Sequence, residues 1–172
     1  RGLPILRDSV EAFPVLKSKK TVELFKAYGV LNKLEVESRF HIAVEKYIKQ
    51  LIIEAETMGH MARTQILPAA LQHQSLLAQA VSSTVAAGVP APEQKAALER
   101  FVGYANRLRE AIGHLEIALE PHEGDPMEHA KHIKAHLIPA MAEVRAAADH
   151  LETVVTAKYW PLPTYREMLF LK

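Results

Sequence analysis

The sequence predicts an all-α protein, an antiparallel three-helix bundle built on one very long kinked helix. Apolar residues recur in alternating steps of three and four over three long stretches, which keeps one face of a helix apolar. Capping residues and glycine or proline breaks delimit the same stretches. Only seven glycines in 172 residues, with almost no alternating apolar pattern, leave little room for a β-sheet.

The beginning of the chain predicts two short elements. Pro4 and Pro14 interrupt it, so we expect only a turn or two of helix at 8–13. Ser18 is a suitable N-cap for a short helix over 19–28, which a glycine follows. A docked C-terminal tail completes the predicted fold.

The longest helix is predicted over 32–87. Asn32 can cap its start, and Glu35 can reach back to the backbone N–H of Asn32, as in a capping box. Pro68 removes one helical hydrogen bond and is expected to kink the helix. Gly88 and a following proline end it. At about 1.5 Å per residue the helix would span about 80 Å. Its apolar stripe begins with Val44, Ile48, Leu51, Ala55, Met58, Ala62 and Ile66.

Two further helices are predicted to fold back along the first. Pro92 suits the first turn of the second helix, and Asp125, Pro126 and Glu128 form a strong start signal for the third. Pro139 should kink the third helix. Short links make consecutive helices antiparallel neighbours. The apolar seams are Leu98, Phe101, Ala105, Leu108, Ile112, Leu115 and Leu119 in the second helix, and Leu137, Met141, Val144, Ala148, Leu151 and Val155 in the third.

Helix lengths predict an uncovered stretch on the longest helix. A second helix of roughly 27 residues covers about 40 Å, so it would reach back only to about Gly59. Part of the apolar stripe over 34–58 would stay exposed, and the isolated chain is expected to self-associate as a symmetric dimer there. The double substitution Ile48→Glu with Leu51→Glu should then give a folded monomer.

The tail after the third helix is expected to dock on the bundle. Two prolines favour an extended segment after Trp160. The residues that follow are too apolar for a free tail: Tyr165, Met168, Leu169, Phe170 and Leu171. We expect these aromatic and aliphatic side chains, together with the tryptophan, to be covered.

The composition excludes several classes of function. A formal net charge of +1 gives no electrostatic reason to expect nucleic acid or an anionic membrane as a partner. The absence of cysteine excludes disulfides and thiolate metal sites, and it suits the reducing cytoplasm. No apolar run approaches the ~20 residues of a membrane-spanning helix. The chain begins at an arginine, and we expect it to be a fragment of a longer or processed protein.

Three histidines share one predicted helical face. His129, His132 and His136 are spaced i, i+3 and i+7, and neutral imidazoles so placed could ligate zinc. Lys131 and Lys134 lie among them, which favours a solvated face. The zinc-protease pattern HExxH is absent.

Carboxylate chemistry has little support. A di-iron bundle needs Glu-x-x-His on two helices, but the acids Glu56 and Glu110 are each followed by a histidine four residues later, as in ordinary helix-surface pairs. For the basic cluster at 17–20 we expect a solvated helix start in preference to a phosphate site. We therefore predict no catalytic, cofactor-binding or metal-binding residue, and a scaffold or assembly module in preference to a self-contained enzyme.

Three segments resemble a known family. Residues 22–74, which begin VELFKAYGVLNKLEVESRFHIAVEKYIKQ, strongly resemble the region after the catalytic domain of type III glutamine synthetases. Residues 159–170, YWPLPTYREMLF, resemble the end of the same enzymes. Residues 3–16 are similar to the last segment of the catalytic domain of glutamine synthetases generally, and 86–157 match only as helical heptads.

The resemblance implies a parent enzyme that joins glutamate and ammonia, using ATP and magnesium or manganese, through a γ-glutamyl phosphate. No position here matches the motifs of its catalytic residues, so the fragment alone is expected to be inactive. Residues 1–31 would be the end of the catalytic-domain region with a short helix, and 32–172 a C-terminal helical bundle domain. Its partners would be its own catalytic domain and neighbouring subunits of a double-ring homo-oligomer. The alternative is an independent helical bundle that binds a metal or a partner protein.

Overall fold

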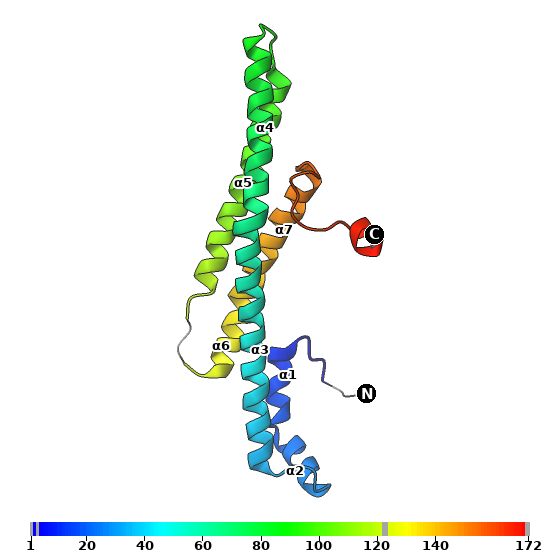
Figure 1. Ribbon diagram of the computed structural model, residues 1–172. Coiled ribbons are helices and arrows are strands. Elements are labelled where there is room, and N and C mark those ends of the chain that lie inside the picture. Colours follow the sequence, from blue (N-terminus) through cyan, green and yellow to red (C-terminus); the bar gives the residue numbers. More distant parts are fainter. Residues whose placement is uncertain (1, 3, 122–123, 171–172) are drawn as a thin grey trace. The chain divides into compact units, whose positions relative to one another are not determined.

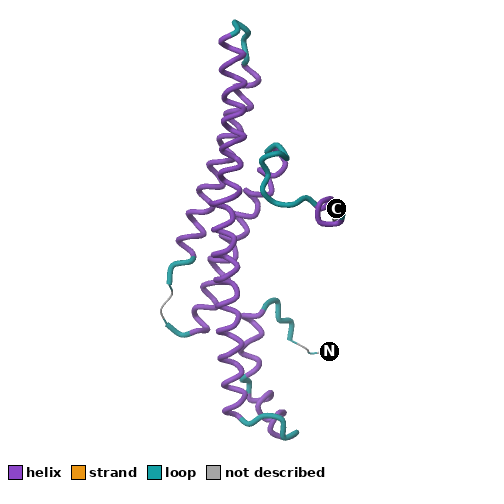
Figure 2. Tube along the Cα trace, in the orientation of Figure 1, coloured by secondary structure: helices purple, strands orange, loops and turns teal. Residues whose placement is uncertain are grey.

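The computed structural model describes residues 2, 4–121 and 124–170, and every regular element among them is helical (Figure 2). The predicted all-α class, with one long helix and short N-terminal helices, is confirmed. The chain divides into two compact units. The first contains residues 1–55 and 119–139, and the second contains 56–118 and 140–172.

The first unit gathers elements from both halves of the sequence. It contains α1 (Ser9–Leu16), α2 (Lys19–Ala27), most of α3 (Lys33–Met61), α6 (Pro126–His132) and a π-helical turn, η2 (Ile133–Leu137). Figure 1 shows α1 and α2 beside the beginning of α3, and α1 also packs on α6. The helix α1 is longer than the turn or two that we predicted, because it continues through Pro14 to Leu16.

The buried stripe of α3 in this unit corrects our prediction of an uncovered half-helix. Val44 and Ala55 are fully buried and Ile48 is 8% exposed. The length argument placed the start of the third helix near Gly59, but α6 and η2 belong to the first unit and contribute to its core. The core of this unit consists of Val10, Val36, Phe40, Val44, Ile48, Ala55, Ala130, Ile133 and Leu137.

The second unit is built on a helical hairpin. It contains the end of α3, a second π-helical turn, η1 (Ala62–Ile66), then α4 (Leu67–Ala86), α5 (Pro92–Ala118), most of α7 (Ile138–Val154) and α8 (Tyr165–Leu169). The helices α4 and α5 run side by side (Figure 1). Gly88, at φ +81°, ends α4 as predicted, and the N–H of Val89 donates to the carbonyl of Thr84 at 3.2 Å. The predicted seam of α5 supplies Phe101, Ala105, Leu108, Ile112 and Leu115 to the core.

Local capping forms the helix starts that the sequence predicted. Asn32 Oδ1 accepts from the N–H of Glu35 at 3.0 Å, and Glu35 Oε2 accepts from the N–H of Asn32 at 2.7 Å. Ser18 Oγ accepts from the N–H of Thr21 at 3.2 Å. Asp125 caps α6 through a bond of 3.0 Å to the first turn. These bonds satisfy backbone donors that have no partner within the helix.

Each of the prolines inside the two longest helical runs follows a widened helical turn. Pro68 comes two residues after η1, and Pro139 comes two residues after η2. In η1 the N–H of Leu67 donates to the carbonyl of Ala62, five residues back, and η2 repeats this bond from Ile138. The predicted interruptions therefore take the form of single π-helical turns, which make room for a ring that would otherwise meet the preceding turn.

The tail is less covered than predicted. Trp160 is half-buried, but Tyr165 is 82% exposed, Leu169 73% and Phe170 71%. The expectation that the whole tail docks on the bundle is wrong for these described residues, and Leu171 lies outside them. The helix α8 forms because Thr164 and Glu167 make a capping box, so it needs no tertiary contact to begin.

Candidate functional site

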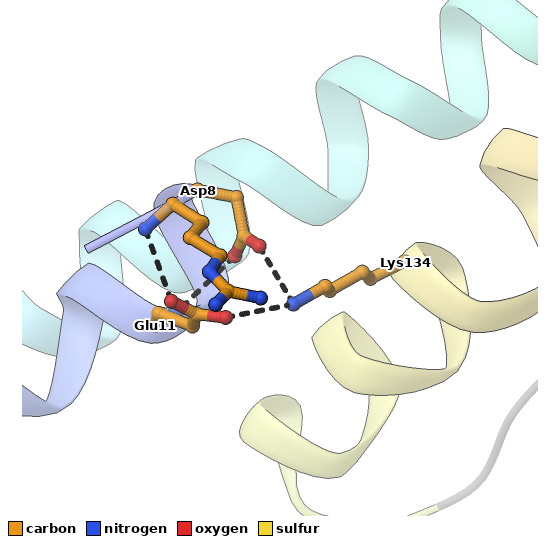
Figure 3. Close-up of polar contacts among 4 residues, drawn as sticks. Asp8, Glu11 and Lys134 are labelled. Carbon is orange, nitrogen blue, oxygen red and sulfur yellow. Dashed lines mark hydrogen bonds and ion pairs between the residues drawn. The ribbon is translucent and has the colours of Figure 1, made fainter. Parts of the chain in front are cut away.

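The most developed polar cluster is an ion-paired junction in the first unit (Figure 3). Lys134 Nζ of η2 lies 2.6 Å from Asp8 Oδ2 and 3.4 Å from Glu11 Oε1. The second oxygen of Asp8 caps α1 by accepting from the N–H of Glu11 at 3.0 Å. The second oxygen of Glu11 accepts from the backbone N–H of Arg7 at 3.0 Å. Both carboxylates thus hold the start of α1 and bind Lys134 together.

The charges of the junction stabilise one another. The hydrogen bond from Lys134 is the main cause that lowers the pKa of Asp8, and the backbone N–H of Glu11 adds to it. The same hydrogen bond to Asp8 raises the pKa of Lys134. The side chains of Lys134 and Asp8 are 41% and 33% exposed, so solvent screens part of this attraction. The junction is a positioning device for α1, held in its charged form at neutral pH.

Two aromatic contacts hold α1 to α3 beside the junction. The rings of Phe13 and Tyr47 meet edge to face, with centroids 5.6 Å apart. Burial, followed by the negative charge of Asp8, raises the pKa of Tyr47, so its hydroxyl stays neutral. Lys17 Nζ lies 4.3 Å from the centroid of the Phe40 ring, within cation–π range. We had interpreted Lys17 as part of a solvated helix start, and sequence reasoning missed this contact because its partner lies on another helix.

His129, His132 and His136, which we had considered as zinc ligands and interpreted as a solvated face, lie on α6 and η2. The rings of His132 and His136 lie 4.5 Å apart. Lys131 binds Glu128 at 2.7 Å, and Lys134 belongs to the junction. Within 4–121 and 124–170, no three histidine or acidic side chains are grouped closely enough to hold a metal ion.

A groove of about 330 Å³ lies between α5 and α7 in the second unit. On one side His114 Nδ1 lies 2.9 Å from Glu143 Oε2, and on the other the ring of Tyr104 meets His150 edge to face at 4.2 Å. Sequence spacing paired His114 with Glu110, but its partner lies 29 residues away. No serine, threonine or cysteine is among the described residues that line this groove. The His–Glu pair therefore has no neighbouring nucleophile of the kind that acyl transfer needs.

Exposed apolar side chains form the remaining candidate surfaces. The first set, named here the N-terminal apolar set, consists of Ile5, Leu6, Val15, Leu16, Leu24, Tyr28, Val30 and Leu34. The second, the tail set, consists of Tyr165, Met168, Leu169 and Phe170. On α3 the exposed pair Ile42 and Ile53 faces solvent, where we had expected Ile48 and Leu51. Large exposed apolar groups are typical of interaction surfaces.

Comparisons with known proteins find similarity to glutamine synthetases. The family model described as the glutamine synthetase C-terminal domain matches residues 1–85. A type-3 glutamine synthetase of Dictyostelium discoideum is 35% identical over 180 aligned residues, which cover 100% of this chain and 24% of the relative. A glutamine synthetase of Butyrivibrio fibrisolvens is 28% identical over 174 residues, covering 99% of this chain and 25% of the relative.

A third relative extends the same pattern. A glutamine synthetase of Bacteroides fragilis is 25% identical, covering 100% of this chain and 25% of the relative. The chain thus spans about a quarter of the length of the curated relatives it matches. Separately, none of the helices in the described ranges has the length and apolar character needed to cross a bilayer.

Proposed function

Because this chain belongs to the glutamine synthetase C-terminal domain family, we propose that it is the C-terminal helical part of an enzyme of the type-3 kind. The observation that carries this proposal is the alignment with a type-3 enzyme, which covers 100% of this chain at 35% identity. The resemblance noted in the segments 22–74 and 159–170 points to the same family.

In this proposal the longer protein makes glutamine from glutamate and ammonia with ATP and magnesium or manganese, in the cytoplasm. The described residues of this chain do not fit the metal, because they contain no group of three suitable side chains. We therefore derive no catalytic step here and place the active site in the part of the longer protein that this chain does not include.

The contribution of this chain would be structural. The tail set supports an assembly role, because Leu169 and Phe170 are largely exposed at the end of a helix that is already capped. Burying a leucine or phenylalanine side chain stabilises by about 1.5–3 kcal/mol, so a neighbouring subunit that covers both would gain several kcal/mol. We assign the tail set to contacts between subunits of a homo-oligomer.

The test uses the longer protein. The unmodified protein should form glutamine in an ATP- and ammonia-dependent assay and should sediment as a large oligomer. The double substitution Leu169→Ser with Phe170→Ser should shift it towards smaller species. The matched control is Ile117→Ser, since Ile117 is 66% exposed on α5, and it should leave the oligomer intact. Absence of glutamine formation would refute the parent activity, and an unchanged oligomer in the tail variant would refute the assembly role.

A further inference from the structure

The groove between α5 and α7 has a floor without long side chains. Ala111, Ala146 and Ala147 line it, and each of these side chains ends at Cβ. Its volume of about 330 Å³ lies at the lower end of the range for small-molecule sites, roughly 300–1,000 Å³. A floor of this kind leaves room for a small ligand whose apolar part is flat.

A pair of side chains from the two helices closes the groove at each end. At one end the rings of Tyr104 and His150 meet edge to face, with centroids 4.2 Å apart. At the other end His114 Nδ1 lies 2.9 Å from Glu143 Oε2, and Nδ1 is the donor because a carboxylate only accepts hydrogen bonds. This bond holds Glu143 in place and leaves its other oxygen, Oε1, without a partner among the described residues.

Two opposite charges lie between these ends. Arg107 and Glu110 line the groove from α5, and neither side chain has a hydrogen-bond or ion-pair partner in the part of the chain that the structure describes. Residues three positions apart on a helix are neighbours, with about 5–6 Å between their Cβ atoms. The groove therefore offers an unpaired guanidinium beside an unpaired carboxylate, and α7 adds the second oxygen of Glu143.

These charges select the kind of ligand. A purely negative ligand would be repelled by Glu110 and Glu143, and a purely positive one by Arg107. A metal ion does not fit, because no three histidine or acidic side chains of the described residues are grouped closely enough to hold one. A ligand with both charges satisfies all three side chains. An α-amino acid carries both charges on one carbon atom, and its charged groups form stronger hydrogen bonds than neutral groups do.

We propose that this groove binds a zwitterionic α-amino acid with an aromatic side chain. The carboxylate of the ligand pairs with Arg107, its ammonium group pairs with Glu110 and Glu143, and its ring lies on the alanine floor. The Tyr104–His150 pair presents aromatic surface at one end, against which such a ring packs. The site goes beyond the proposed function and does not depend on it, because every residue that forms it belongs to this chain.

Histidine footprinting of the full-length protein that contains this chain locates the ligand, with L-phenylalanine as the probe. Diethyl pyrocarbonate acylates accessible imidazoles, and mass spectrometry gives the rate at each histidine. L-Phenylalanine should slow the reaction of His114 and His150 in a saturable manner. His60 is exposed on α3 and does not line the groove, so its rate should not change. No protection of the two groove histidines, or equal protection of His60, would overturn the proposal.

Two analogues test whether both charges of the ligand are needed. 2-Phenylethylamine lacks the carboxylate, and 3-phenylpropanoate lacks the ammonium group. The Kd of each, measured by the same protection, should be at least about tenfold higher than that of L-phenylalanine, because each analogue loses its hydrogen bonds to one side of the charged pair. An analogue that binds as tightly as L-phenylalanine would refute the assignment of the group that it lacks.

Charge variants of the full-length protein identify the binding residues. Arg107→Gln and Glu110→Gln should each raise the Kd of L-phenylalanine at least about tenfold. The matched controls, Arg109→Gln and Glu99→Gln, remove the same charges from exposed positions of α5 that do not line the groove, and they should leave the Kd unchanged. Protection that persists unchanged in both groove variants would refute the proposed contacts.

A variant of the floor tests the groove without changing any charge. Ala146→Leu places a longer side chain where the ring of the ligand would lie, so it should abolish protection of the groove histidines. The control, Ala142→Leu, changes another exposed position of α7 that does not line the groove. Circular dichroism should show that both variants keep their helix content. Equal binding of L-phenylalanine by the two variants would show that the ligand does not occupy this groove.

Discussion

His73 on α4 illustrates how one residue can couple stability to pH. Its ring meets Phe101 edge to face at 4.9 Å, and its Nδ1 is buried without a hydrogen-bond partner in the part of the chain that the structure describes. Burial lowers the pKa of His73, because the charged imidazolium is poorly solvated there. The folded protein therefore prefers the neutral ring.

We expect the free energy of unfolding to respond to acid through His73. Since its folded-state pKa is lowered, the unfolded chain binds the proton more readily, and stability is complete above about pH 6.5, the ordinary pKa of histidine. Stability should fall as the pH drops below that value. Urea unfolding of the unmodified chain and of His73→Leu across this range checks it, because the leucine variant should lose less stability on acidification. Parallel pH profiles for both chains would contradict this account.

Sequence reasoning succeeded for residues whose partners are local. The caps Asn32, Ser18 and Asp125 were predicted because each acts within three residues of itself. The partners of Lys134 and His114 were not predicted, since they lie more than 25 residues away and nothing in the spacing of charges identifies them. Long-range ion pairs depend on how helices pack, and apolar seams fix that packing only loosely.

At the scale of elements, prolines act differently according to their position in a helix. Pro92 stands at the first position of α5, where the backbone N–H would have no partner in any case. Pro68 stands just after η1, inside the continuous helical run from Lys33 to Ala86, where its ring and missing N–H have a cost. The structure accommodates that cost in one widened turn.

We predict that Pro68→Ala stabilises the chain, by up to about 3 kcal/mol, the difference between proline and alanine inside a helix. The widened turn already relieves part of this cost, so a smaller gain is also consistent. Pro92→Ala should change stability by less than about 0.5 kcal/mol. Denaturant midpoints of the two variants give the comparison. If Pro92→Ala raised the stability as much as Pro68→Ala does, the position of Pro68 inside the helix would have no special cost in stability, and this account would be wrong.

At the scale of the whole molecule, the seams predicted the number and length of the long helices but not how they share the core. All three apolar seams have the same spacing, so they do not indicate which part of one helix packs on another. We inferred the pairing from the predicted helix lengths alone, and the inference that the stripe over 34–58 stays uncovered was wrong. The structure assigns 119–139 to the same unit as 1–55. Ile48 is therefore part of a core, and the exposed pair on α3 is Ile42 and Ile53.

This correction changes the expected outcome of substitutions on α3. Ile48→Glu would bury an unpaired carboxylate, at a cost of several kcal/mol, and should unfold the first unit in place of giving a folded monomer. Ile42→Glu with Ile53→Glu places charges on side chains that are 62% and 61% exposed, and this variant should keep its helix content. Circular dichroism distinguishes the two cases, and sedimentation of the exposed-pair variant reports whether this face mediates self-association. Equal loss of helix in both variants would contradict the burial pattern.

The two π-helical turns have a consequence for how this protein can tolerate changes in length. Such a turn holds one residue more than an α-helical turn, so the extra residue is accommodated within the turn and the helix beyond it keeps its phase around the axis. Deleting one residue within η1 or η2 would let the turn close as an ordinary helix, with the change in phase confined to the next few residues. The helical runs 33–86 and 126–154 therefore each have one place where evolution can add or remove a single residue without a loop.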